Sequence, residues 1–258
     1  MNEVVLKTYV FLSIIIAATD IILAIKSIKK NKTTGRFLGL ACIGAAIVDI
    51  SYLISIISDS YMAMSVMSSI YFVSIDYMLV CLLIFTVYFT KGRFSKYGRV
   101  AIGVCFFYCL YELVIFAINP FKNIAIGYVR RDTVIAKYRY DMHLVFSYAL
   151  VSVVLILLVK KLCKIPHEYR LQYSSVILGL LALVGINAIF LYVPGAEVYK
   201  LLDYSICGYS LTSYILYWSC FNYSTHGMLN KLKTNIFENI GQGIVLFDYD
   251  NHLILHND

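Results

Sequence analysis

Long apolar segments alternate with short polar ones along most of the chain. Seven of the apolar segments are close to or above the roughly 18 residues that a membrane-spanning helix requires. They cover residues 4–25, 37–58, 65–90, 100–118, 143–159, 170–192 and 203–221. Short segments rich in Lys, Ser, Asn, Pro or Gly separate them. The pattern therefore predicts an all-α membrane protein, a bundle of seven transmembrane helices.

The composition agrees with this interpretation. Of the 258 residues, 60% are apolar and only 14% are charged, whereas about a quarter of the residues in soluble domains are charged. The mean hydropathy is +0.77. These values exclude an ordinary soluble domain and a disordered chain. No basic segment precedes the first apolar run, so we expect that run to be an uncleaved span and not a signal peptide.

The distribution of Lys and Arg predicts the orientation in the membrane. The loops after the first, third and fifth spans, together with the C-terminal tail, hold 15 of the 22 basic residues. The positive-inside rule then places the N-terminus outside and the C-terminus in the cytoplasm of a plasma-membrane protein. Because the basic residues lie in short loops beside the lipid bilayer, the net charge of +7 does not predict a nucleic-acid partner.

The outer loop between the fourth and fifth spans is unusually long. Its centre, Ile124 to Tyr140, alternates between apolar and polar residues, which predicts a β-hairpin turning near Arg131 and Asp132. An isolated hairpin is marginally stable in water, so it has to lean on the helix ends. Its basic residues either are solvated, which we favour, or meet an anionic ligand or lipid headgroups; they are Arg130, Arg131, Lys137 and Arg139.

The tail after the last span changes character. Residues 224–240 are polar with an apolar stripe, which predicts a signalling linker helix after a sensor domain at 1–223. The stripe consists of Leu229, Leu232, Ile236 and Ile240. It pairs either with the same stripe of a second copy in a homodimer or with the domain that follows it. Residues 241–258 read as two strands around an acidic turn. A lone hairpin cannot bury an apolar face, so we interpret them as the beginning of an incomplete cytoplasmic α/β domain.

Acidic residues inside the spans are the strongest functional candidates. A carboxylate at mid-bilayer costs about 2.5–3.5 kcal/mol on insertion scales. Counted along the spans, Asp49, Asp76 and Glu112 fall at similar depth, slightly outward of the midplane. Asp20 lies nearer the inner face, and we expect it to pair with loop lysines. Four tyrosines are close in sequence to the three outer carboxylates: Tyr52, Tyr77, Tyr108 and Tyr111.

Two interpretations of these residues remain open. In the first, the carboxylates and tyrosines line a pocket, open to the outside, for a polar or cationic small molecule. In the second, they form interhelical hydrogen bonds that fix the packing. Asn187 in the sixth span is more typical of packing.

Other functions lack their motifs. A retinal protein needs a lysine in a late span, and residues 203–221 contain none. No paired intramembrane histidines, HExxH, GxSxG or Walker A motif is present. The seven cysteines form no Cys-x-x-Cys pair and no Cys/His cluster at metal-ligand spacing. The sequence therefore predicts no enzymatic activity within this chain, no disulfide, no cofactor and no metal site.

Three stretches carry a family resemblance. The fifth span opens with His143-Leu-Val-Phe-Ser-Tyr148, and the sixth is entered through Pro166-His-Glu-Tyr-Arg-Leu-Gln-Tyr173 and later contains Asn187. With these stretches the chain resembles the seven-transmembrane N-terminal sensor region of bacterial histidine kinases and diguanylate cyclases. The segment Ile236 to Asn257 resembles the opening of a PAS domain.

The resemblance implies a sensory input module. A membrane-borne or extracellular small molecule would be detected in the bundle, and the last helix would pass the change to a cytoplasmic PAS and output domain, of kinase or cyclase type. This requires a two-state element whose states differ in affinity for the ligand. Two alternatives stand beside it: a small-solute or proton-coupled transporter that uses the intramembrane carboxylates, and a membrane anchor and dimeriser that binds no ligand.

Overall fold

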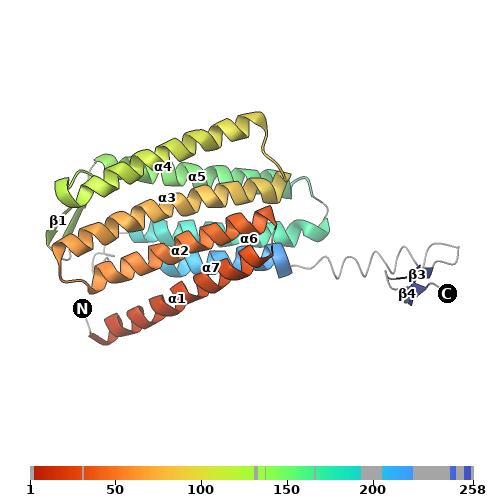
Figure 1. Ribbon diagram of the computed structural model, residues 1–258, viewed down its shortest axis with the longest axis horizontal. Helices are drawn as coiled ribbons and strands as arrows, with labels where there is room; N and C mark the ends of the chain where they lie inside the picture. The colour runs from red at the N-terminus through yellow and green to blue at the C-terminus, as the bar shows by residue number, and fades with distance from the viewer. Residues whose placement is uncertain are drawn as a thin grey trace. The chain divides into compact units, whose positions relative to one another are not determined.

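A computed structural model describes residues 3–30, 32–130, 133–136, 138–165, 167–192, 205–222, 245–247 and 253–256. Each predicted span corresponds to one helix (Figure 1). The helices are α1 (Glu3–Lys29), α2 (Thr33–Ile57), α3 (Tyr61–Lys91), α4 (Lys96–Lys122), α5 (Tyr138–Leu162), α6 (His167–Tyr192) and α7 (Ser205–Tyr217). The chain divides into two compact units, Met1–Cys220 and Phe221–Asp258.

Six of the helices, α1 to α6, are long and apolar enough to cross a bilayer. The seventh, α7, has 13 residues of α-helix, and a π-helical turn, η2 (Trp218–Asn222), follows it directly. A π-helical turn adds a residue to the helical repeat and is frequent at functional sites. The last span is thus irregular at the end that leads into the tail.

Local sequence signals set the ends of α3 and α4. The Ser60 and Ser95 side chains cap the two helix starts, and the backbone N–H of Gly98 donates to Ser95 at 3.0 Å. Helix α3 ends at Gly92, whose φ of +71° is a left-handed conformation that glycine adopts without strain. Helix α4 ends at Asn123, also left-handed at φ +48°. The short turn between them makes α3 and α4 antiparallel neighbours.

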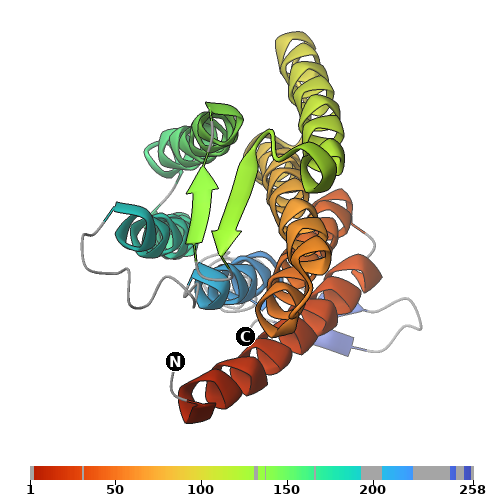
Figure 2. The ribbon, with the colours of Figure 1, turned by 90° about the vertical axis from the view of Figure 1, so that its left-hand side faces the viewer.

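The seven helices pack around two central members. Helix α3 packs against α2, α4 and α5, and α7 packs against α1, α2 and α6. The neighbours α1 and α2 pack directly on each other, as do α5 and α6. Helix α4 lies at the outer edge, against α3 (Figures 1 and 2). The candidate residue Asp76 on α3 therefore lies on a helix that three others contact.

Small residues on α2 allow close helix contacts. A Cβ atom added at Gly44 would lie 2.9 Å from the Met78 Cβ of α3, and one at Gly39 would lie 2.5 Å from the Ile28 Cγ1 of α1. Such distances are shorter than real Cβ atoms tolerate, so both positions depend on glycine. In a bilayer, where lipid is as apolar as Leu, this close packing is a principal source of helix association.

The hairpin predicted between the fourth and fifth spans is present at one end of the bundle. Strands β1 (Ile126–Arg130) and β2 (Thr133–Ala136) pair antiparallel, with Ile126 opposite Ala136. Figure 2 views this end and shows the two strands in front of the helices. The predicted turn residues Arg131 and Asp132 lie outside the described residues.

Asn119 ties the base of this hairpin to α4. Its Oδ1 accepts hydrogen bonds from the backbone N–H of Ala125 at 2.8 Å and of Ile126 at 3.0 Å, and all three residues are buried. Ala125 and Ile126 form a buried apolar cluster with Ile115 and Phe116, onto which Phe72 and Tyr140 pack. The hairpin is therefore attached to the helix ends by the Asn119 side-chain amide and by this apolar cluster.

The C-terminal unit contains a second hairpin. Strands β3 (Val245–Phe247) and β4 (Leu253–His256) pair antiparallel, with Leu246 opposite Leu255. The predicted linker helix at 224–240 lies outside the described residues, and so does its stripe of Leu229, Leu232, Ile236 and Ile240. The assignment of 241–258 to a PAS-type domain stays a prediction.

Candidate functional site

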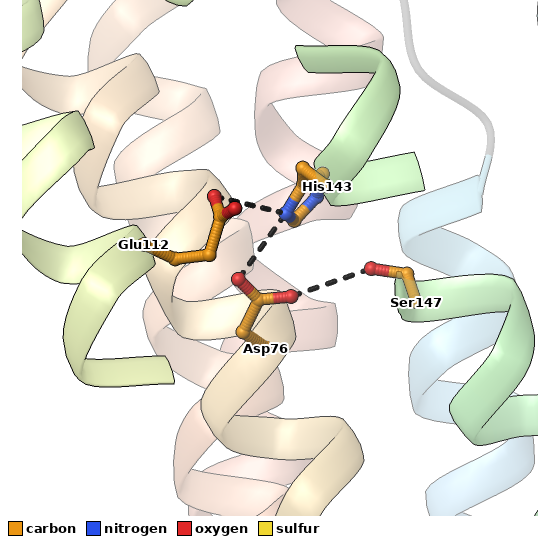
Figure 3. A network of polar contacts seen from close by, with 4 residues as sticks. All are labelled: Asp76, Glu112, His143 and Ser147. Carbon is orange, nitrogen blue, oxygen red and sulfur yellow. Dashed lines mark hydrogen bonds and ion pairs between the residues drawn. The ribbon is translucent and has the colours of Figure 1, made fainter. Parts of the chain in front are cut away.

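Three buried ionisable side chains meet between α3, α4 and α5. The Nδ1 atom of His143 lies 3.2 Å from Oδ2 of Asp76 and 4.0 Å from Oε2 of Glu112. Figure 3 shows the two carboxylates and the imidazole pointing toward one another from the three helices. All three side chains are buried, with at most 2% of the surface of each residue exposed. We call this set the acid–histidine cluster.

Helical spacing places a fourth residue at the cluster. Ser147 follows His143 by four residues, so both side chains lie on one face of α5. The Ser147 hydroxyl donates to Oδ1 of Asp76 at 3.3 Å, as Figure 3 shows. The two oxygens of Asp76 therefore have different partners, with Oδ2 directed at the imidazole.

Aromatic rings surround the imidazole. The Phe72 ring lies edge-on to it at a centroid distance of 5.2 Å, and the Phe116 ring does so at 5.7 Å. The Tyr140 ring stacks on it at a centroid distance of 6.3 Å. Because Phe116 also belongs to the apolar cluster under the hairpin, the acid–histidine cluster adjoins the base of the hairpin. The three ionisable groups consequently lie in an apolar environment, where electrostatic interactions are strong and unpaired charges are costly.

Glu112 is incompletely satisfied. Its Oε2 and the hydroxyl of Tyr108 are both buried, and neither makes a hydrogen bond of standard geometry, although the two side chains interact directly. The nearby Arg139 donates to the hydroxyl of Tyr111 and not to a carboxylate. Each of the three residues of the cluster offers one possible metal-ligand atom. These three atoms lie within 4.8 Å of one another, a spacing compatible with holding a metal ion.

The structure separates the carboxylates that the sequence grouped by depth. Asp76 and Glu112 come together, but Asp49 on α2 belongs to a second buried group with Asp20 of α1 and Ser213 of α7. The expectation that Asp20 pairs with loop lysines is wrong. Its carboxylate is fully buried between helices, because its face of α1 turns toward α2 and α7, which both pack on α1.

The four predicted tyrosines are also divided. Tyr108 and Tyr111 are on α4 near Glu112, with ring centroids 5.9 Å apart. Tyr52 instead packs between Tyr9 and Tyr71. The fourth, Tyr77, is 40% exposed on α3.

His143 and Ser147 are not among the site residues predicted from the sequence. His143 sits near the start of a span, which made it look like a boundary residue. The available signal was the i, i+4 pair of a histidine and a serine at the opening of an apolar helix, within the stretch that carries the family resemblance.

Polar contacts continue from this region toward the end of α7. The hydroxyl of Tyr148 on α5 donates to Oδ1 of Asn187 on α6 at 2.7 Å. Near the other end of α6, the Gln172 amide donates to the backbone carbonyl of Ser219 in η2. The hydroxyl of Ser175 lies 3.1 Å from that of Ser219. Side chains of α6 therefore contact both the helix that carries His143 and the π-helical turn.

Comparison with known proteins agrees with this architecture. None of the curated proteins matches the chain significantly. Residues 9–228 match the model of the family described as the N-terminal 7TM region of histidine kinase. The match covers the described helices from the first turns of α1 through η2. The chain belongs to this family, and it is a multi-pass membrane input region of the histidine-kinase type.

Proposed function

We propose that the acid–histidine cluster is the input site of a membrane sensor, and that α7 and the linker after it carry the signal into the cytoplasm. The observation that carries the proposal is the burial of Asp76, Glu112 and His143 where three helices meet. A change in charge or ligation there alters the free energy of packing of α3, α4 and α5 together. A site on one helix alone would have no such effect.

The proposed orientation is N-terminus outside and C-terminus in the cytoplasm. It rests on the excess of Lys and Arg in the loops after α1, α3 and α5. In this orientation the β1–β2 hairpin lies on the outside, and the stimulus reaches the cluster from the hairpin end. Reporter fusions at the C-terminus test the orientation, because external activity would contradict it.

Transmission uses the polar contacts of α6. A displacement of α5 reaches α6 through Tyr148 and Asn187, and α6 holds the η2 turn through Gln172 and Ser219. The linker at 224–240 then rotates or shifts, in a homodimer paired through its apolar stripe, and acts on a PAS-type domain that begins at about 241. The output is a kinase or cyclase activity.

Hydrogen–deuterium exchange of the whole chain in lipid nanodiscs tests the coupling. We expect Asp76→Asn to change exchange in η2 and in residues 223–240, far along the chain from the substitution. Asp59→Asn, which removes an equal charge from the exposed α2–α3 turn, is the matched control and should leave these segments unchanged. If both variants give wild-type exchange there, the cluster is packing only and the anchor function is favoured.

Solute flux distinguishes the sensor from the transporter alternative. Proteoliposomes that contain this chain alone should bind ligand without net flux of protons or small solutes. Flux that Asp76→Asn abolishes would contradict the sensor and favour the transporter.

A further inference from the structure

We propose that the acid–histidine cluster binds a divalent first-row transition-metal ion, with Asp76, Glu112 and His143 as its three protein ligands. This inference rests on the proposed function in one respect: if the cluster is the input site, the metal ion is the stimulus or is required to form the site. Metal binding itself is a separate property and is tested separately.

The first argument is geometric. Metal–ligand distances of about 2.0–2.2 Å place neighbouring donor atoms about 3.0–3.5 Å apart around one ion. The His143 Nδ1 to Asp76 Oδ2 distance of 3.2 Å already lies in this range. The Nδ1 to Glu112 Oε2 distance is 4.0 Å, and the three donor atoms lie within 4.8 Å of one another. Closing to about 3.0–3.5 Å requires a movement of about 1–2 Å by a flexible carboxylate. Ligands from three different helices surround one point, which a surface cluster of acids does not do.

The second argument is the excess of acidic groups around one imidazole. Asp76 and Glu112 place two carboxyl groups at about 1% exposure each beside His143, and Oε2 of Glu112 makes no hydrogen bond of standard geometry. Arg139, a full helical turn before His143, is bound to Tyr111. Two ionised carboxylates need two positive charges, and a protonated imidazole supplies only one. A divalent ion compensates both and uses the neutral imidazole as a ligand, since an imidazole nitrogen must be unprotonated to bind metal.

The third argument is the chemistry of the donors. One imidazole and two carboxylates suit Zn²⁺, Mn²⁺ or Fe²⁺, whereas Mg²⁺ and Ca²⁺ prefer all-oxygen sites. With three protein ligands, a further position stays open for water or for a stimulus molecule. Ser147 holds Oδ1 of Asp76 and so directs Oδ2 toward the ion, as outer hydrogen bonds do for metal-binding carboxylates. The aromatic rings on His143 keep bulk water from the site.

The test is a titration of the whole chain with Zn²⁺. The protein is purified in nanodiscs through an affinity tag without histidine, stripped with a chelator and titrated by calorimetry, with bound metal counted by mass spectrometry. Wild type should bind one more Zn²⁺ per chain than His143→Gln or Asp76→Asn. The difference removes the contribution of the seven cysteines and the tail histidines, which all three proteins share. Asp49→Asn, which removes a buried carboxylate from the other group, is the control and should keep the wild-type stoichiometry.

A milder variant keeps the metal-binding test valid if a variant that lacks a ligand does not fold. Ser147→Ala keeps all three ligands and should weaken the site about 10- to 100-fold, as typical of outer-shell partners. In wild type, about 1,000-fold excess of Mg²⁺ should not displace the Zn²⁺. Equal Zn²⁺ stoichiometry and affinity in wild type, His143→Gln and Ser147→Ala would overturn the proposal.

The two proposals fail in distinguishable ways. If Zn²⁺ binds at this site but exchange in η2 and in residues 223–240 does not respond to it or to Asp76→Asn, the metal site stands and the sensor function is wrong. If Asp76→Asn changes that exchange but the site-specific Zn²⁺ is absent, the sensor function stands and the metal site is wrong.

Discussion

Replacing Asn119 by Ala tests how the β1–β2 hairpin is attached to the bundle. In wild type one side-chain oxygen accepts hydrogen bonds from two buried backbone N–H groups, those of Ala125 and Ile126. Alanine removes the acceptor and leaves both donors without a partner. The cost is about 1–2 kcal/mol for each unsatisfied buried donor, which gives about 2–4 kcal/mol for the pair.

Hydrogen exchange measures this cost locally. At about 1.4 kcal/mol per factor of ten, the amides of Ala125 and Ile126 should exchange about 30- to 1,000-fold faster in Asn119→Ala than in wild type. Helices α6 and α7 should exchange as in wild type, because they lie outside the hairpin's apolar cluster. Asn119→Asp keeps an oxygen acceptor at the same place and should lose much less protection.

Unchanged exchange at the two amides in Asn119→Ala would refute this account of the hairpin base. If the account holds, the same variant should expose the acid–histidine cluster more often, because Phe116 belongs both to the hairpin cluster and to the shell around His143. A metal ion in the site would then be released faster to a chelator. This consequence is specific to the hairpin end of the bundle.

Two further substitutions probe the helix contacts. Gly44→Ala brings a Cβ to 2.9 Å from an α3 side-chain atom, and this overpacking should destabilise the bundle by about 1–3 kcal/mol. In Gly103→Ala, the matched control, the Cβ meets nothing within 4 Å, so denaturant unfolding in detergent should show wild-type or slightly higher stability. Tyr148→Phe removes the hydrogen bond to Asn187 and should cost about 0.5–1.5 kcal/mol in the same unfolding assay. It should also reduce the effect of cluster variants on exchange in η2; a Tyr148→Phe protein with full coupling would rule out this route through α6.

The positions of the helices could be predicted from the sequence, because the requirement for them is local. A bilayer forces each spanning segment to satisfy its own backbone hydrogen bonds, so span length and hydrophobicity appear directly in consecutive residues. The β1–β2 hairpin was similarly predictable, since its alternating residues act over a few positions. The short α7 and its π-helical turn could not be predicted in this way; the turn lies where side chains of α6, distant in sequence, contact Ser219.

The composition of the candidate site was decided by the tertiary structure. Counting residues along the spans placed Asp49, Asp76 and Glu112 at similar depth in the bilayer. Depth does not determine which face of a helix contacts which neighbouring helix. Packing of α3 between α4 and α5 joined Asp76 and Glu112 to His143, while packing of α2 beside α1 and α7 placed Asp49 with Asp20. The sequence by itself determined that charges are buried in a membrane bundle. Only the rotation and adjacency of the helices, set by side-chain packing between segments distant in sequence, determined which charges meet.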